Sequence, residues 1–346
     1  MGKSRVAIFL LVLMSVLSGC TQQEQVNIDK GMKLVEQLDY AGALECFEAA
    51  IVYEEDEQLL YRGMGLAYMG MSEYAKAAEK FLQSISYAQG NVTDLEFDTN
   101  YYLAAAYYKQ GLYEEAEEIY SAMIALREKE VDAYFLRACT LLKENYYESA
   151  IVDFEKAFAL EPDNLELVTD AYVEMQAAGF SAEGKEYLQK FMSEKEKKLT
   201  DSEKGTLYYY LEDYANARIY LDGALNQGNA EVSLILGKTY EKLGDMNYAS
   251  VVYQTYLDGN PPSAAIYNSL GTCLMEQEKY EEALAAFTSG IDMGDTAYLQ
   301  SLKYNQIIAY EYLGKFSEAK SAMETYLANY PDDAKAKREY DFLKTR

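Results

Sequence analysis

The 346-residue chain contains neither histidine nor tryptophan, and it has only four cysteines and four prolines. The absence of histidine removes histidine-dependent catalytic triads, histidine metal ligands and the commonest general base. Cys46, Cys139 and Cys273 are too few and too scattered along the chain to form a zinc site. We therefore expect a protein that is not an enzyme and that holds no metal or cofactor.

A phosphate-binding loop is also missing. Gly237-Lys238-Thr239 resembles the end of such a loop, but the loop needs a glycine at the position where Val232 stands. Gly237 also belongs to a repeating column of small residues that is described below. We interpret this segment as part of the repeat.

Positive charge is scarce as well. The chain has 31 lysines and arginines against 57 aspartates and glutamates, which gives a formal net charge of −26. Such a surface repels nucleic acid and anionic lipid headgroups, and it favours basic partners. The alternative interpretation is that the acidic residues only solvate the outer helix faces of an extended protein. We expect no nucleic-acid binding.

What the chain does have is a small residue that returns every 32 to 39 positions. This column contains Ala43, Ala77, Ala116, Ala150, Gly184, Ala217, Ala249, Ala283 and Ala319. In most copies a ring stands three residues earlier, and a large apolar residue stands four residues later in all of them. Residues four apart share one face of a helix, so each copy predicts a helix, a short turn and a second helix. A fixed period of this length is typical of stacked repeats.

A second small column lies twelve residues before the first. It contains Gly31, Gly65, Ala104, Ala138, Gly205, Gly237 and Gly271, and it is interrupted by Tyr172 in the fifth copy and Ile307 in the ninth. Two small columns on successive helices predict that the two backbones approach closely, with the rings filling the space beside them.

These columns resemble the tetratricopeptide repeat (TPR) family, which has a small residue at repeat position 8, alanine at 20 and aromatic residues at 17 and 24. The resemblance implies an all-α protein, a right-handed α-solenoid of about nine repeats over residues 24–331, with a capping helix at 332–346. The repeats would start near Glu24, Gln58, Phe97, Val131, Leu165, Lys198, Ala230, Ala264 and Gln300. The tryptophan that is usual at position 4 is absent in every copy.

The first residues have a different character. Lys3 and Arg5 precede an apolar run, Val6–Leu17, which is too short to span a bilayer but suits a signal peptide. Leu17-Ser18-Gly19-Cys20 resembles the lipobox of bacterial lipoproteins. We expect residues 1–19 to be cleaved, Cys20 to be lipidated and residues 20–23 to form a short tether. The protein would then be lipid-anchored on the extracytoplasmic side of the cell membrane, unless this is an ordinary secretory signal with a chance cysteine.

In the TPR family the first helices of successive repeats line a concave groove, through repeat positions 2, 5, 9, 12 and 13. The resemblance implies a partner groove that includes Met32, Arg62, Leu66, Met69, Tyr101, Tyr108, Phe135, Tyr209, Tyr304 and Tyr312. The same positions in the seventh to ninth copies also supply Lys238, Glu241, Asn268 and Met275. Tyrosine and methionine suit peptide recognition. The alternative interpretation is that individual rings only pack against neighbouring helices.

The family's carboxylate-binding subclass is not supported, because Leu66 stands where its asparagine is expected. We expect a membrane-anchored scaffold or adaptor that binds partner peptides or helices in the groove. The alternatives are a solute- or glycan-binding envelope lipoprotein and a lipoprotein subunit of a secretion, pilus or outer-membrane assembly machine. Five additional residues at 92–96 and the weak copies at 180–204 suggest two places where the array flexes.

Overall fold

A computed structural model describes residues 26–88, 90, 92–225, 228–331 and 333–346. The predicted signal peptide, Cys20 and the tether lie outside the described residues. All regular secondary structure in these segments is helical, which confirms the all-α prediction. None of the described helices is both long enough and apolar enough to cross a membrane.

The chain divides into two compact units, and the division falls between Gln110 and Gly111. The first unit contains α2 (Val26–Glu36), α3 (Tyr40–Val52), α4 (Glu57–Gly70), α5 (Tyr74–Tyr87) and α6 (Asp94–Gln110). This boundary falls inside the predicted third repeat. It coincides with neither of the two places where flexing was suggested, and flexing there stays a prediction.

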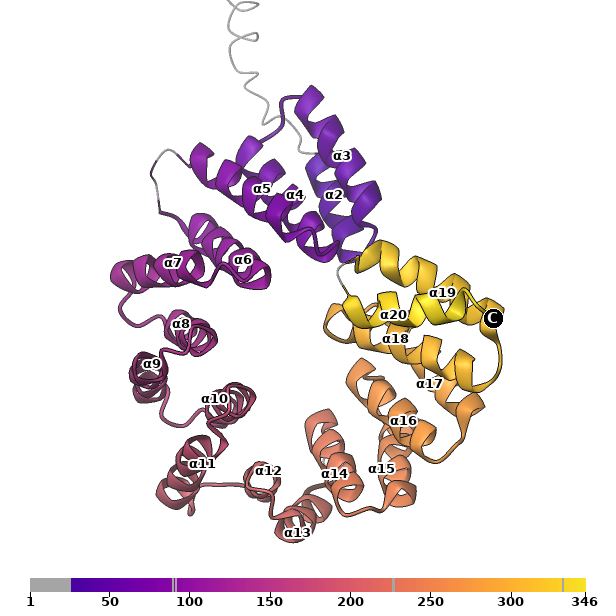
Figure 1. Cartoon of the computed structure of the whole chain (residues 1–346). Helices are drawn as coiled ribbons and strands as arrows, with labels where there is room; N and C mark the ends of the chain where they lie inside the picture. Colours follow the sequence, from indigo (N-terminus) through magenta and orange to yellow (C-terminus); the bar gives the residue numbers. More distant parts are fainter. Residues whose placement is uncertain (1–25, 89, 91, 226–227, 332) are drawn as a thin grey trace, which may run out of the picture. The chain divides into compact units, whose positions relative to one another are not determined.

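The second unit continues the alternation of first and second helices to the end of the chain (Figure 1). It contains α7 (Tyr113–Leu126), α8 (Val131–Lys143), α9 (Tyr147–Leu160), α10 (Leu165–Ala177), α11 (Ser181–Lys195), α12 (Asp201–Tyr210), α13 (Tyr214–Ala224), α14 (Ala230–Lys242), α15 (Met246–Gly259), α16 (Ala264–Glu276), α17 (Tyr280–Asp292), α18 (Thr296–Tyr312), α19 (Phe316–Asn329) and α20 (Ala334–Leu343). The first helices α8, α10, α12, α14, α16 and α18 each contact the next one in the row. In Figure 1, these first helices α10, α12 and α14 lie on one side of the second unit, and the second helices α9, α11 and α13 lie on the other.

The residues added at 92–96 lengthen a helix. Asp94 begins α6, and Glu96 in its first turn is only 5% exposed. The Glu96 carboxylate accepts hydrogen bonds from the Thr93 backbone N–H at 2.7 Å and from the Gln58 side chain on α4. Burial opposes ionisation, but these hydrogen bonds outweigh it and lower the pKa of Glu96. The addition therefore attaches α6 to α4.

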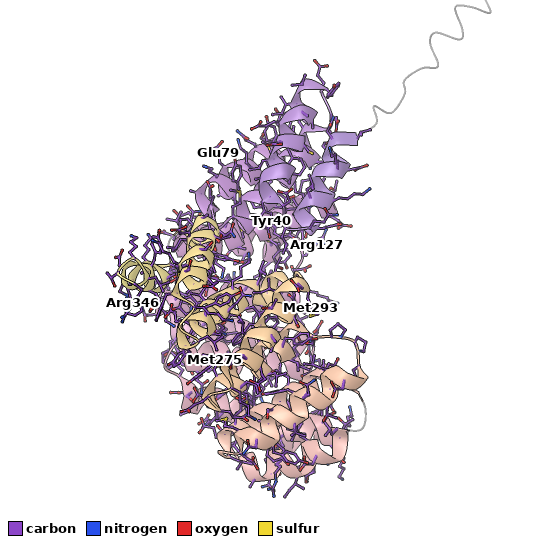
Figure 2. The ribbon with its side chains drawn as sticks, turned by 90° about the vertical axis from the view of Figure 1, so that its right-hand side faces the viewer. Tyr40, Glu79, Arg127, Met275, Met293 and Arg346 are labelled. Atoms are coloured by element: carbon purple, nitrogen blue, oxygen red, sulfur yellow. The ribbon has the colours of Figure 1, made fainter. Side chains whose placement is uncertain are left out.

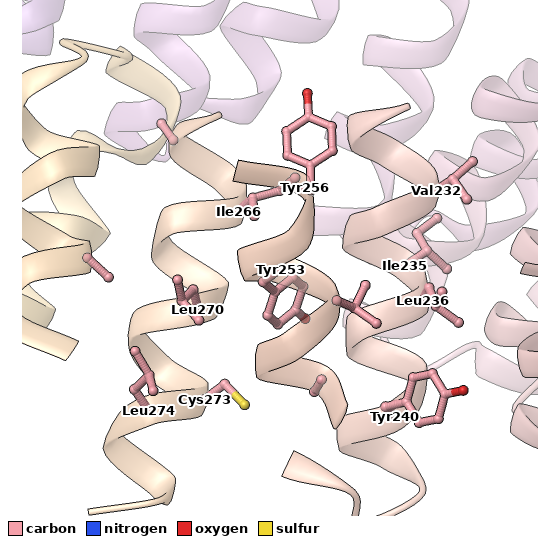
Figure 3. Close-up of a cluster of buried hydrophobic side chains, with 14 of the residues drawn as sticks. Val232, Ile235, Leu236, Tyr240, Tyr253, Tyr256, Ile266, Leu270, Cys273 and Leu274 are labelled. Carbon is pink, nitrogen blue, oxygen red and sulfur yellow. The ribbon is translucent and has the colours of Figure 1, made fainter. Parts of the chain in front are cut away.

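The two small columns bring the helices of a repeat together as expected. A Cβ atom added to Gly237 would lie 2.1 Å from the Tyr253 ring, and one added to Gly271 would lie 2.3 Å from the Phe287 ring. Only glycine leaves room for a ring at this distance. Figure 3 shows Tyr253 on α15, with Leu236 on α14 to one side and Leu270 on α16 to the other. We call this arrangement the glycine–ring contact.

Candidate partner-binding face

Within each unit, the lining positions of the first helices form a surface that we call the first-helix face. In the first unit it includes six of the predicted groove residues, all of them partly buried: Met32 on α2, Arg62, Leu66 and Met69 on α4, and Tyr101 and Tyr108 on α6. The helices α2, α4 and α6 are neighbours in this order. The structure therefore brings these six residues onto one series of adjacent helices.

Two of the six help to hold the first unit together. Arg62 forms an ion pair with Asp98 on α6, and its guanidinium lies 5.4 Å from the centre of the Tyr102 ring. Met32 packs against a buried cluster that contains Ile28 and Phe47. The contacts of Arg62 and Met32 therefore agree with the alternative interpretation, in which the side chains pack against neighbouring helices.

In the second unit, three predicted residues are also engaged with neighbours. The Phe135 ring on α8 meets Phe154 on α9 at a centroid distance of 5.6 Å, and the Tyr209 ring on α12 lies 5.8 Å from that of Tyr214 on α13. Burial, then the neighbouring tyrosines and Glu241, raise the pKa of Tyr209 to about 12. The Tyr304 ring has the Lys335 ammonium of α20 at 4.5 Å from its centre. Each of these rings stabilises the contact between adjacent helices.

Tyr312 differs from the others, because 62% of its surface is exposed. Its ring stacks on Tyr280 with a centroid separation of 4.9 Å and an angle of 25° between the ring planes. Tyr312 is the last residue of α18, and Tyr280 is the first residue of α17. The pair forms a flat aromatic wall at the junction of the eighth and ninth repeats.

This wall borders a pocket of about 420 Å³ between α16, α17 and α18, which we call the repeat 8–9 pocket. Its lining consists of Thr272, Met275, Glu276, Glu278, Tyr280, Phe287, Asn305, Ile308 and Tyr312. Its volume is within the range that is usual for ligand sites in proteins. Met275, labelled in Figure 2, lies on α16 and contributes to one side of the pocket.

The polar groups of the pocket come from three helices and a turn. The Asn305 amide nitrogen donates to the Asn268 side-chain oxygen at 3.0 Å, which joins α18 to α16. Glu276 ends α16, and Glu278 follows in the turn with a left-handed backbone (φ 60°). Among the described residues, neither Glu276 nor Glu278 has an ion-pair partner.

Of the residues that line this pocket, only Met275 and Tyr312 were predicted from the sequence. Thr272, Glu276 and Ile308 occupy lining positions 9 and 13, so the repeat numbering alone was enough to find them. Tyr280 and Phe287 belong to the columns three residues before and four residues after Ala283, which predicted packing and not a pocket. No sequence signal pointed to Glu278 or Asn305.

The described cysteines are free thiols, and burial raises the pKa of both Cys139 and Cys273. The Cys273 thiol donates to the Met246 carbonyl at 3.2 Å. In the described part of the chain, no three cysteine, aspartate or glutamate side chains are placed so that they could hold a metal ion.

Comparison with known protein families identifies the chain. Models of the tetratricopeptide repeat family match residues 28–91, 62–131, 249–297 and 304–340, and a further model of the same family matches 131–164. These matches cover more than half of the chain. The chain therefore belongs to the tetratricopeptide repeat family.

Individual relatives are more distant. The TPR repeat-containing protein MJ1428 of Methanocaldococcus jannaschii is 25% identical over 278 residues, which cover 79% of this chain and 43% of that protein. The chain thus spans less than half the length of this relative. Among solved structures, a TPR protein from Parabacteroides merdae is 14% identical with a TM-score of 0.44, covering 72% of this chain and 98% of that one. MamA from Desulfovibrio magneticus is 18% identical with a TM-score of 0.42, covering 51% and 97% respectively. These likenesses concern the fold alone.

Proposed function

We propose that this chain is a membrane-anchored TPR lipoprotein that acts as a protein-interaction scaffold or adaptor on the extracytoplasmic surface. TPR proteins typically bind other proteins, and this one would bind partner peptides or helices on its first-helix face. The main support is the repeat 8–9 pocket, which combines an exposed, stacked tyrosine with methionine on that face. The net charge of −26 favours basic partners and disfavours nucleic acid.

The anchor is argued from sequence. The apolar run Val6–Leu17 and the tetrapeptide that ends in Cys20 have the composition and order of a lipoprotein signal. Two acyl chains on Cys20 would hold the protein durably at the membrane, since each buried methylene contributes about 0.8 kcal/mol.

A pull-down from detergent-solubilised membranes tests the first-helix face. The variant Met275→Ala/Tyr312→Ala should lose a partner that the wild-type chain retains. The control is Ile219→Ala/Val251→Ala, which truncates residues that are 59% and 55% exposed on the second helices α13 and α15. If the wild type and both variants recover the same proteins, the pocket is not the partner site.

Membrane fractionation tests the anchor independently. Cys20→Ser should move the protein from the membrane fraction to the soluble or secreted fraction, whereas Cys46→Ser, which changes a cysteine within α3, should stay with the membrane. A Cys20→Ser protein that remains in the membrane fraction would rule out lipid anchoring at this residue.

A solute- or glycan-binding role is the second candidate. One observation favours it: Asn305, whose amide bonds that of Asn268, lines the same pocket as the exposed Tyr312 ring, and amides and rings can both contact sugars. Binding of purified cell-wall glycan that Tyr312→Ala abolishes, without any protein partner, would favour this alternative.

A further inference from the structure

The lining of the repeat 8–9 pocket combines apolar and aromatic side chains with two carboxylates, and the inference drawn from this combination rests on the proposed function. Met275 and Ile308 supply apolar surface, and the stacked rings of Tyr280 and Tyr312 supply one wall. A surface of this kind accommodates the methylene chain of a long side chain.

The pocket lining also includes two carboxylates that have no ion-pair partner among the described residues. Glu276 and Glu278 lie on either side of Gln277, and the nearby Lys279 ammonium donates to the Gln277 side chain at 2.7 Å. The Lys279 ammonium therefore bonds a neutral amide and forms no ion pair with either carboxylate. Burial and then the neighbouring Glu278 raise the pKa of Tyr280, so this negative charge acts on the aromatic wall itself.

We propose that this pocket receives a lysine or arginine side chain from a basic segment of the partner protein. The stem would lie on Met275 and Ile308, and the cationic head would lie against the tyrosine pair within reach of Glu276 and Glu278. Aromatic faces attract cations, and the attraction strengthens as water is excluded. A neutral or acidic side chain would leave both carboxylates without a counter-charge.

Contacts between a cation and an aromatic ring, of the kind proposed for the pocket, also occur within the fold of the chain. The Lys335 ammonium lies 4.5 Å from the centre of the Tyr304 ring, and the Arg346 guanidinium lies 4.6 Å from that of Phe342. In both places a basic side chain of the α20 segment covers a ring. At the repeat 8–9 pocket the stacked rings and the carboxylates are present without a basic side chain of the described residues over them.

Selection from a phage-displayed library of random peptides tests the proposal on the full chain in detergent. We expect enriched peptides to share a lysine or arginine at one position. Synthetic versions should bind Glu276→Gln/Glu278→Gln about tenfold more weakly than the wild type. Glu281→Gln/Glu282→Gln, an equal change of charge on exposed residues of α17, should bind like the wild type, and melting curves should show all three chains equally folded.

The remaining outcomes separate this inference from the proposed function. One such outcome is that peptides fail to bind Tyr312→Ala and yet bind Glu276→Gln/Glu278→Gln like the wild type. That result would agree with a partner site at the pocket and would contradict a lysine or arginine as its occupant. Peptides indifferent to both changes would overturn the site itself. As a direct probe, n-butylguanidinium should shift the methyl resonance of Met275 in methionine-labelled protein, whereas neutral n-butylurea should not. Equal shifts with the two compounds would contradict the role of charge.

Discussion

The eighth and fifth repeats both pack a large side chain against a glycine, but they place the two residues on opposite helices. In the eighth, the first helix provides Gly271 and the second provides the ring of Phe287, which fills the space that the glycine leaves. In the fifth, the first helix provides the large residue Tyr172, and the second faces it with Gly184. A Cβ atom on Gly184 would lie 3.0 Å from the Tyr172 ring. Each pair therefore joins one large residue to one glycine, and only the helix that carries the glycine changes.

The ninth repeat makes a similar adjustment. Ile307 replaces the small residue on its first helix, and Met323 replaces the ring on its second helix, in one buried cluster with Ala319. Since protein interiors are close-packed, the summed volume across a helix pair is what the fold preserves. Repeats that depart from the family pattern are thus repacked and remain buried.

The largest effect is expected from removing the ring of the eighth repeat. Phe287 is fully buried, so Phe287→Ala should cost about 3–5 kcal/mol of stability. Leu188→Ala in the fifth repeat should cost less, because the smaller side chain leaves a smaller cavity and Tyr172 lies beside Gly184 to fill part of it. Hydrogen exchange resolved by helix measures both losses. Equal losses of protection in α16–α17 and α10–α11 would contradict the idea that Tyr172 compensates.

A smaller effect is expected from exchanging the glycines themselves. Gly271→Ala places a Cβ atom 2.3 Å from the Phe287 ring and should destabilise the chain by about 1–3 kcal/mol. Gly184→Ala meets Tyr172 only at 3.0 Å, and alanine is the better helix former by about 1 kcal/mol, so the two effects should nearly cancel. Urea unfolding of both variants checks the contrast. A Gly184→Ala chain less stable than Gly271→Ala would reverse it.

The smallest effect is expected at the end of the ninth repeat. Burial and Glu339 on α20 raise the pKa of Glu311 on α18 to about 7, and one carboxyl oxygen of Glu311 is buried without a hydrogen-bond partner. Asp333, Lys335 and Arg338 are charged groups at the same end of the ninth repeat. The charge of Asp333 raises the pKa of Tyr304 and that of Arg338 lowers it, and the Lys335 ammonium lies over the Tyr304 ring.

The sign of the pH dependence follows from proton binding. Between the ordinary carboxyl pKa of about 4.3 and about 7, folded Glu311 retains a proton that the unfolded chain has released. Stability from this site is therefore present at low pH and is lost as the pH rises through that window. Glu311→Gln should remove this dependence, and melting temperatures of both proteins across the window measure it. Parallel curves for wild type and variant would contradict the assignment.

The repeat period predicted most of the fold, because each helix pair shows its buried face as columns of small and large residues. It did not predict that Tyr172 on the first helix would pack against Gly184 on the second. In the sequence, a large residue at a small-residue position appears only as an interruption of the column, because the compensating glycine lies on another helix. Nor did it show that Asp94–Glu96 would extend α6, because that outcome depends on Gln58, a residue of another repeat.

The site was less predictable than the fold. The lining positions led to Met275 and Tyr312, but they equally selected Phe135 and Tyr304, whose rings contact other helices. A position that faces the groove also borders the next helix, so residue type alone does not separate the two roles. Glu278 is in a turn outside those positions, and its place at the pocket becomes visible only in three dimensions.

Phe287 takes part both in the packing of the eighth repeat and in the repeat 8–9 pocket. It is the ring of the glycine–ring contact with Gly271, and it also lines the repeat 8–9 pocket. Occupancy and folding of this repeat are therefore thermodynamically linked: a ligand that binds only the folded pocket raises the free energy needed to open α16 and α17. A thermal-shift screen then detects ligands even while the partner is unidentified, and local opening of the repeat abolishes the binding site before the rest of the array unfolds.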